Sequence, residues 1–531
     1  MEAVKPALLR RSQPTEAEIH DRRWWTLSVL VLSLIIIFVG NSSLNVAIPV
    51  LSRDLQATTS QLQWVVAVYS LVFAGLLFTT GALGDRYGRK GALQLGLLLY
   101  LVAAGMATLS SAMWQLIACR AVMGAAAALI MPSTLSILIN VFPPDERPRA
   151  IAIWASFLGA AGAIGPTVSG WLLVHFWYGS VFFVNVPFIL LALVSGWFLI
   201  PRSRDPEEAR VDPGGALLSI VGIVALVYGL IEAPDKGWGS ASTLVAFAVA
   251  TVVLALFVVW EKRVDEPMLD MRYFRNPAFS TGSGGMILVF LGMYGVMFML
   301  TQYLQLVLGY SALGAAVRFL PMTPIMLLVA PRTPKLSDRF GAHRVVAVGM
   351  SLTALGFVLF ANLQTASSYA YILVSIFPFA TGLALTMSPM TSSIMSAVPP
   401  RRAGAGSATN DATRELGAAL GVAVLGSLAA SKFASGLRAV TSRLSPADRR
   451  EARSSLSDSL AVAHRLPHAT GAAVEHGAKV AFVDGIHLAC WLGAGLTMAA
   501  VGVVLRYLPH TVGGETEVLQ PDDGLALALV E

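Results

Sequence analysis

Long apolar stretches recur along nearly the whole chain, and this repetition limits the possible folds more than any other feature. A helix needs about 20 mostly apolar residues to cross the hydrocarbon core of a bilayer. Fourteen stretches reach that length. The sequence therefore predicts an all-α membrane protein with fourteen transmembrane helices, near residues 26–50, 62–83, 92–110, 113–136, 149–173, 180–200, 214–233, 242–260, 280–307, 311–332, 343–362, 367–390, 409–430 and 479–507.

The composition agrees with lipid as the surrounding solvent. Of the 531 residues, 56% are hydrophobic and 13% are charged, whereas soluble domains carry about 25% charged residues. The net charge of +6 is spread over short loops rather than gathered in one patch with aromatic residues, which excludes a nucleic-acid partner. Cys119 and Cys490 fall inside apolar stretches, so we expect buried thiols rather than disulfide or metal ligands.

The distribution of Lys and Arg predicts the orientation of the helices. With the N-terminus inside, the inner segments carry 24 of these residues, and the short outer loops carry two, Arg53 and Lys236. A long polar outer segment, 432–478, is less informative, because the rule holds for short loops. We expect both termini in the cytoplasm and a location in the cell membrane. The first apolar stretch has no small-residue cleavage site, so we interpret it as an uncleaved helix.

A short motif occurs twice on the inner side and indicates an internal repeat. Residues 83–89 read Leu-Gly-Asp-Arg-Tyr-Gly-Arg, residues 336–344 read Leu-Ser-Asp-Arg-Phe-Gly-Ala-His-Arg, and their aspartates are 253 positions apart. The repeat predicts two related six-helix bundles with two helices inserted between them. The predicted divisions are a tail (1–25), an N-terminal bundle (26–200), the inserted helices with their loops (201–279), a C-terminal bundle that includes the outer loop 432–478 (280–507), and a second tail (508–531).

The first copy of this motif has the features of a conformational gate. Asp85 can accept hydrogen bonds from an arginine or a helix N-terminus. Gly81 and Gly88 allow close approach and tight turning on either side of it. We predict that these residues, with Arg86 and Arg89, control a conformational change. The alternative is a basic anchor that only fixes the topology.

Two further motifs lie within predicted helices. Arg120 lies in the fourth helix, and a charge inside the membrane must face a partner or a cavity. The alternative is an arginine that reaches water at the outer interface. In the fifth helix, Gly165, Pro166 and Gly170 combine small residues with a helix-bending proline. That pattern suits close helix packing, with or without a role in function.

Acidic residues in the thirteenth helix are candidates for binding a proton. Asp411 and Glu415 are four residues apart and share a helix face, with Arg414 beside them. Neighbouring carboxylates in a poorly solvated place raise each other's proton affinity. We rank Asp411 first and Glu415 second. The alternative is a salt bridge with Arg414 at the inner end of the helix.

Taken together, these motifs resemble the major facilitator superfamily, and in particular its fourteen-helix drug:proton antiporter branch. Asn45–Pro49, Val184–Pro187, Thr301–Gln305 and Asn410–Glu415 fit the same branch. The resemblance implies two bundles with alternating access, a gating loop at Asp85, and a place for Arg120 in the proton pathway. It also implies that Gly165, Pro166 and Gly170 form the antiporter motif, which is associated with export. On this resemblance we predict a substrate cavity lined by Asn45, Tyr69, Gln302 and Tyr303.

The sequence departs from the branch at two acidic positions. Members commonly have an aspartate in the first helix, where this chain has Gly40, and another in the second helix, where it has Ala67. Neither residue can bind a proton. Ser169 also replaces a usual glycine in the antiporter motif. If the protein is driven by protons, another membrane group must therefore titrate.

Three interpretations of function follow. The first is export of small hydrophobic drugs, antibiotics or natural products by proton antiport, with protons and membrane lipid as the other partners. The second is a transporter without proton coupling, or one specific for an anionic metabolite. The third is a non-transporting membrane sensor on the same fold. The chain contains no Walker motif, metal-spaced histidines or nucleophile elbow, so we expect no enzyme activity, no cofactor and no metal.

Overall fold

The computed structural model describes residues 16–143, 146–203, 212–265, 267, 269–398 and 403–509. Helices account for nearly all of these residues. The side chain of Asp85 lies outside the described part, so the predicted gating motif can be located only through the residues next to it.

The N-terminal half consists of helices that pack mainly on one another. α1 contacts α4, α5 and α7, and α4 contacts α2 and α3. Their bounds are α1 (Glu16–Asp54), α2 (Thr59–Tyr87), α3 (Arg89–Thr108), α4 (Met113–Val141), α5 (Arg147–His175), α6 (Ser180–Phe183) and α7 (Asn185–Leu199).

The C-terminal half is a second group, in which α10 packs on α15, α16 and α19, and α14 packs on α15 and α19. Its helices are α10 (Pro277–Gln302), which continues as a wider π-helical turn (Tyr303–Val307), α11 (Ala312–Phe319), α12 (Met322–Val329), α13 (Thr333–Phe340), α14 (Ala342–Phe360), α15 (Tyr369–Ser396), α16 (Ala403–Gly436), α17 (Pro446–Ser454), α18 (Leu456–Arg465) and α19 (His468–Tyr507).

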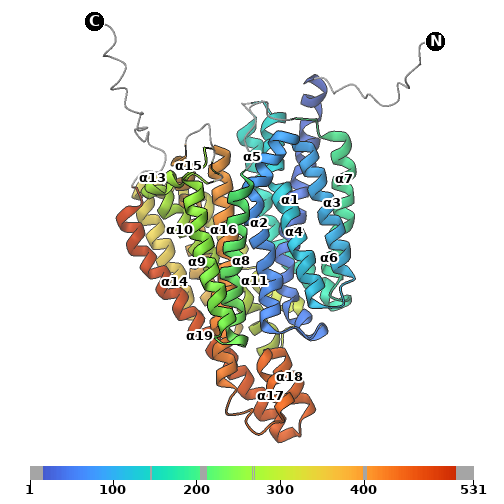
Figure 1. Ribbon diagram of the computed structural model, residues 1–531, viewed down its shortest axis with the longest axis vertical. Helices are drawn as coiled ribbons and strands as arrows, with labels where there is room; N and C mark the ends of the chain where they lie inside the picture. Colours follow the sequence, from blue (N-terminus) through green and yellow to red (C-terminus); the bar gives the residue numbers. More distant parts are fainter. Residues whose placement is uncertain are drawn as a thin grey trace, which may run out of the picture.

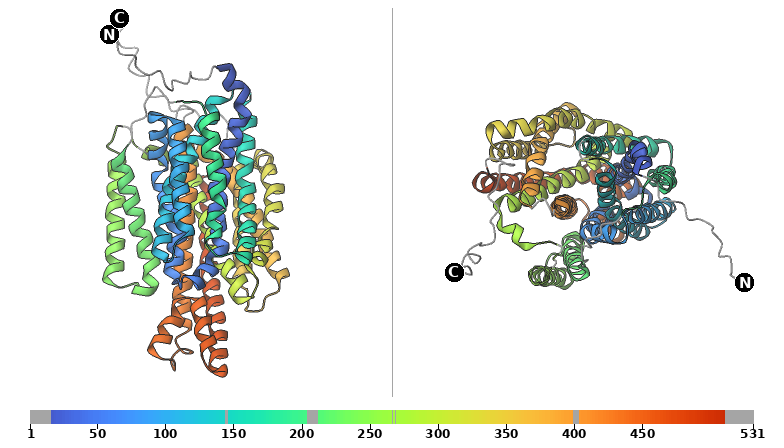
Figure 2. Two further views of the ribbon diagram at one scale, coloured as in Figure 1. Left: turned by 90° about the vertical axis from the view of Figure 1, so that its right-hand side faces the viewer. Right: turned by 90° about the horizontal axis from the view of Figure 1, so that it is seen from above.

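Two inserted helices form a hairpin. They are α8 (Pro213–Lys236) and α9 (Ala241–Glu261), and in the sequence they follow the N-terminal half and precede the C-terminal half. α8 packs against α2 of the N-terminal half and α16 of the C-terminal half. Figure 2 shows the hairpin at one edge of the bundle. Its outer helix α9 exposes apolar side chains such as Leu244, Val245 and Val252, as expected of a helix that faces lipid.

The ends of the bundle differ (Figure 1). α1 begins and α19 finishes at one end, which we call the termini end. α17 and α18 protrude from the opposite end, which we call the cap end. Exposed tryptophans lie near both ends of the membrane helices, as in the aromatic belts of membrane proteins. They include Trp25, Trp197 and Trp260 towards the termini end, and Trp114, Trp177 and Trp238 towards the cap end.

The predicted membrane helices agree with the structure. Thirteen helical segments of the described chain are long and apolar enough to cross a membrane. α5, with 29 residues, corresponds to the remaining predicted stretch, 149–173.

Three predicted stretches differ in detail from the observed helices. The stretch 311–332 is divided into α11 and α12 and is followed by α13, with prolines at Pro321, Pro331 and Pro334. Proline lacks a backbone donor and interrupts the helical hydrogen-bond ladder. The stretch 180–200 is divided at Val184 into α6 and α7. α19 begins at His468, eleven residues before the predicted 479, and takes up part of the outer loop.

The two inner turns of the sequence repeat have the same backbone conformation. Gly88, between α2 and α3, has φ +117° and ψ 121°, and Gly341, between α13 and α14, has φ +87° and ψ 136°. Both values of φ lie where only glycine is comfortable. The repeat in sequence therefore corresponds to a repeated turn.

Candidate transport site

Arg120 of α4 is completely buried among helices of the N-terminal half. Its Nε donates to the Val65 carbonyl at 3.1 Å, and its Nη2 donates to Asn41 Oδ1 at 2.9 Å. The guanidinium lies 4.2 Å from the centre of the Tyr69 ring. A buried cation thus has two hydrogen bonds and a cation–π contact. None of the three partners can neutralise its charge.

The Arg120 site extends to the C-terminal half through Asn41. Asn41 accepts from Arg120 and donates through Nδ2 to the hydroxyl of Tyr294 on α10, at 3.4 Å. Two successive hydrogen bonds therefore connect Arg120 through Asn41 to Tyr294, across the interface between the halves. A change in the separation of α1 and α10 would alter the surroundings of the cation directly.

The two acids of α16 have different environments. Asp411 Oδ1 lies 3.7 Å from Arg414 Nη1 and accepts from Asn410 Nδ2 at 3.4 Å. Glu415 lies beside Ser70 of α2 and interacts electrostatically with Arg414 and Asp411 of its own helix. It also interacts with Arg120, Tyr69 and Tyr294 of other helices. Its Oε2 is buried and has no hydrogen-bond partner in the described part of the chain. Glu415 is therefore the acid that faces the Arg120 site.

Several polar atoms around this site are buried without a hydrogen-bond partner in the described part of the chain. Leaving such an atom unpaired costs about 1–3 kcal/mol. Unpaired buried polar atoms are rare in folded proteins, so these atoms distinguish the region from an ordinary apolar core. They are Asn45 Oδ1, the Tyr69 hydroxyl, the Tyr100 hydroxyl, Arg120 Nη1 and Glu415 Oε2.

The positions that lack the family acids are filled in two different ways. A Cβ atom at Gly40 would lie 2.2 Å from the Tyr100 hydroxyl, so the tyrosine occupies the space beside α1. Ala67 is buried in a small apolar cluster with Val227 of α8 and Ala419 of α16. Tyr100 was missed by sequence reasoning, because nothing in its neighbourhood of α3 distinguishes it from an ordinary core tyrosine.

The glycines of the predicted gating loop are not equivalent. Gly88 adopts a positive φ, whereas a Cβ at Gly81 would meet no atom closer than 3.7 Å. The Arg89 amide donates to the Ser203 carbonyl at 3.1 Å. Lys90 Nζ donates to two carbonyls at the end of α7, those of Trp197 (2.8 Å) and Ile200 (2.7 Å). The loop is thus attached to α7, while Arg86 is exposed.

The glycines of α5 make close contacts with both halves. A Cβ at Gly165 would lie 2.0 Å from Ser42 Oγ of α1, and one at Gly170 would lie 2.7 Å from the Leu313 Cα of α11. Ser169 Oγ donates to the Ser43 carbonyl at 2.9 Å. Pro166 is partly buried in the same stretch. The segment therefore holds α5 against α1 and brings its last turns against the opposite half.

The predicted cavity residues do not form one group. Tyr69 lies against Arg120, and Asn45 lies one turn of α1 beyond Asn41, which accepts from Arg120. Gln302 lines a small pocket nearer the cap end with Thr59 of α2 and Phe482 of α19. Tyr303 lies apart, because its hydroxyl donates to the Gln364 carbonyl at 2.5 Å in the loop between α14 and α15.

Hydrogen bonds between the halves are found from the membrane interior to the cap end. Gln63 Oε1 accepts from Ser427 Oγ at 3.2 Å, and Gln305 Nε2 donates to the Val46 carbonyl at 3.0 Å. Beyond the membrane helices, Thr59 Oγ1 donates to the carbonyl of Ser454 in α17 at 2.7 Å. The halves are therefore closed against each other at the cap end.

Comparison with known proteins decides the family. The profile of the Major Facilitator Superfamily matches residues 30–422. This chain is a member of the major facilitator superfamily. Curated relatives include the multidrug efflux pump LfrA of Mycolicibacterium smegmatis, 35% identical over 92% of this chain and 97% of the relative. The methyl viologen resistance protein SmvA of Salmonella typhimurium is 33% identical over 91% of this chain and 98% of the relative.

Two further comparisons extend this result. The tetracenomycin C resistance and export protein of Streptomyces glaucescens is 33% identical over 78% of this chain and 77% of that protein. Among solved structures, a bacterial homologue of the human lysosomal transporter Spinster, inward-facing and unoccupied, superposes with a TM-score of 0.64 at 19% identity. That match covers 91% of this superfamily member and 98% of the other chain, and it confirms the fold.

Proposed function

We propose that this superfamily member exports small hydrophobic drugs, antibiotics or natural products across the cell membrane in exchange for protons. Relatives that align over most of the chain carry the names of multidrug efflux and antibiotic export proteins. The bias of basic residues supports a cytoplasmic termini end. The described conformation is then closed towards the outside.

One observation carries the proton-coupled part of the proposal. Glu415 of the C-terminal half interacts electrostatically with the buried Arg120 of the N-terminal half, and its Oε2 has no hydrogen-bond partner in the described part of the chain. An acid at this interface is attracted by the cation when ionised and released from it when protonated. Proton binding would thus change the attraction between the halves, which is what coupling requires.

The geometry favours Glu415 over Asp411 as the coupling acid. Asp411 lies 3.7 Å from Arg414 on its own helix. Glu415 interacts with Arg414 and Asp411 of that helix as well, but also with Ser70 of α2, Arg120 of α4 and Tyr294 of α10. Movement between the halves would therefore change the environment of Glu415 more than that of Asp411. Of the alternatives that the sequence leaves open, this arrangement argues most strongly against an uncoupled transporter.

The driving force is sufficient for export. One inward proton provides about 2.3 kcal/mol per 100 mV of membrane potential. A difference of one pH unit adds about 1.4 kcal/mol, and together these support a gradient of roughly several hundredfold for a neutral substrate.

The test is accumulation of ethidium or methyl viologen in bacteria that express the protein, with and without a protonophore. Cells with the parental protein should accumulate less of at least one compound, and the protonophore should abolish the difference. Arg120→Ala, at equal membrane abundance, is the inactive control. Export that persists after the protonophore would replace the antiporter by an uncoupled transporter. No difference between parent and control for a broad compound panel would favour the sensor.

A further inference from the structure

The inserted helix α8 is attached to the N-terminal half by a set of polar contacts near the cap end. Ser60 of α2 lies against the last turns of α8, where its hydroxyl contacts the Ile231 carbonyl at 3.2 Å and Asp235 Oδ2 at 2.6 Å. Trp64, one turn further along α2, donates to Glu232 Oε1 at 3.1 Å. We call these contacts the α2–α8 staple.

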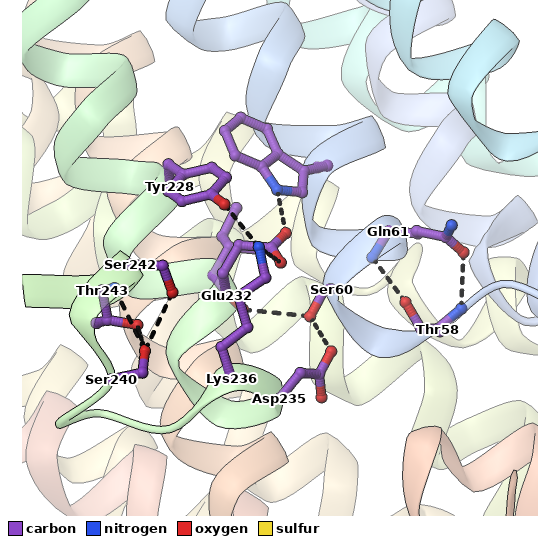
Figure 3. Close-up of polar contacts among 12 residues, drawn as sticks. Thr58, Ser60, Gln61, Tyr228, Glu232, Asp235, Lys236, Ser240, Ser242 and Thr243 are labelled. Carbon is purple, nitrogen blue, oxygen red and sulfur yellow. Dashed lines mark hydrogen bonds and ion pairs between the residues drawn. The ribbon is translucent and has the colours of Figure 1, made fainter. Parts of the chain in front are cut away.

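Residues of α8 itself hold the staple in place (Figure 3). Lys236 Nζ lies 3.2 Å from Glu232 Oε2 and donates to the Tyr228 hydroxyl at 2.6 Å. Ser60 is only 6% exposed. The Glu232 carboxylate is therefore bonded to α2 through one oxygen and to its own helix through the other, a charge-assisted arrangement that resists separation from α2.

The contact of the hairpin with the C-terminal half has a different character. Val227 and Ile231 of α8 share one apolar cluster with Ala419 and Ala423 of α16, and Ala67 and Leu71 of α2 belong to it too. Towards α2 the cluster is supplemented by the staple, and towards α16 it is not. One hydrogen bond, from Trp238 Nε1 in the turn after α8 to Ser431 Oγ of α16, lies at the exposed edge of this contact at 3.2 Å. Apolar packing on alanines has no directional bonds to break, so it permits sliding more readily than the staple does.

We infer that the inserted hairpin moves as one body with the N-terminal half, and that its contact with α16 is a latch that opens with the cap end. The staple fixes α8 to α2, and the Trp238–Ser431 bond adds to the Gln63–Ser427 bond that closes the halves directly. The inference rests on alternating access in the proposed function. It assigns to the two inserted helices the role of bracing α2 against α16.

Pairs of cysteines, joined by a bifunctional thiol cross-linker that spans each contact and is released by reduction, test this division. In a background with Cys119→Ala and Cys490→Ala, the staple pair is Ser60→Cys with Asp235→Cys, and the latch pair is Trp238→Cys with Ser431→Cys. The pair Gln63→Cys with Ser427→Cys joins the halves directly and serves as the positive control. Drug export is measured in each protein before cross-linking, after it, and after reduction, so that each variant is its own control for folding.

The expected result is export near the reduced level when the staple is cross-linked, and about tenfold loss, reversed by reduction, when the latch is cross-linked. Loss of export on cross-linking the staple, or unchanged export on cross-linking the latch, would overturn the inference. The Gln63–Ser427 control distinguishes failure of the inference about the hairpin from failure of the proposed function. If that cross-link leaves export intact, alternating access itself is wrong.

A second readout does not depend on export. Spin labels are placed at exposed positions Leu217 of α8, Leu95 of α3 and Val348 of α14. Release of the Gln63–Ser427 cross-link should change the 217–348 distance and leave the 217–95 distance unchanged. The opposite pattern would show that the hairpin moves with the C-terminal half.

Discussion

At the scale of single residues, the site depends on groups that approach one another from distant parts of the chain. Arg120 and Asn41 are 79 residues apart, and Asn41 and Tyr294 are 253 residues apart. Sequence patterns select Arg120, because a charge in an apolar stretch is conspicuous. They do not select Asn41 or Tyr294, because no periodicity links these positions of α1 and α10 with α4.

The pairing of Gly40 with Tyr100 gives the first prediction. Gly40→Ala would place a Cβ 2.2 Å from the Tyr100 hydroxyl, and overpacking of this kind costs about 1–3 kcal/mol. We expect reduced drug export at normal membrane abundance. Adding Tyr100→Phe removes the clashing oxygen and leaves the ring carbon at 3.4 Å, an ordinary contact. Export by the double variant above that of Gly40→Ala is the predicted rescue; if none is seen, the clash does not explain the loss.

Arg120 gives the second prediction. Arg120→Lys keeps the charge but cannot reproduce both hydrogen bonds and the flat contact with Tyr69. Loss of one charged hydrogen bond is worth about 1.5–3 kcal/mol, so we expect export to fall roughly tenfold or more. Arg120→Ala should be inactive. Transport rates are compared at equal protein amount in proteoliposomes. A lysine variant with the parental rate would show that charge alone is sufficient.

At the scale of elements, apolar runs of the right length predict where the helices lie, but they do not predict where a helix is interrupted. Length identifies α1, α2 and α4 because each crosses the bilayer without a break. The division of 311–332 depends on how neighbouring helices accommodate prolines, which a hydropathy pattern does not contain. The extension of α16 and α19 beyond the membrane depends on packing against α17 and α18. Such packing cannot be derived from a polar segment.

The turn between α2 and α3 gives the third prediction, with a matched control in the same motif. Gly88 has φ +117°, and forcing a side chain into such a conformation costs on the order of 1–3 kcal/mol. Gly81→Ala would meet nothing closer than 3.7 Å. We expect Gly88→Ala to lower the melting temperature and export, and Gly81→Ala to behave like the parent. Equal effects of both substitutions would argue that the backbone of this turn is unimportant.

The two helices that protrude at the cap end, α17 and α18, which we call the cap, give the fourth prediction. Burial raises the pKa of the Asp458 carboxyl in α18 above its ordinary value of 3.8. A raised pKa in the folded state favours the neutral acid, so this contribution to stability is present at acid pH and is lost as pH rises through the folded-state pKa. The cap should therefore lose stability between acid and neutral pH, and Asp458→Asn should reduce that loss.

Limited proteolysis of the cap in the intact protein, across this pH range, measures the effect. Asp448→Asn is the matched control, because Asp448 occupies the same position relative to the N-cap serine of α17. It should show the parental pH trend. If Asp458→Asn also shows that trend, another group is responsible.

At the scale of the whole molecule, the two halves place groups of opposite charge near their interface and are closed against each other at the cap end. The N-terminal half contributes Arg120, and the C-terminal half contributes Glu415. The sequence predicts the superfamily fold, the repeat and both charged residues. It ranks Asp411 above Glu415, whereas we propose the reverse order, because spacing along one helix cannot show how each acid lies relative to the other half.

The most direct test of proton coupling compares two transport modes of Glu415→Gln in proteoliposomes. The amide keeps the shape of the side chain and cannot release a proton. We predict that drug transport driven by a pH gradient is lost, while exchange of labelled for unlabelled drug without a gradient continues near the parental rate. Asp411→Asn is the matched control on the same helix and should retain both modes. Gradient-driven transport by Glu415→Gln at the parental rate would contradict the account.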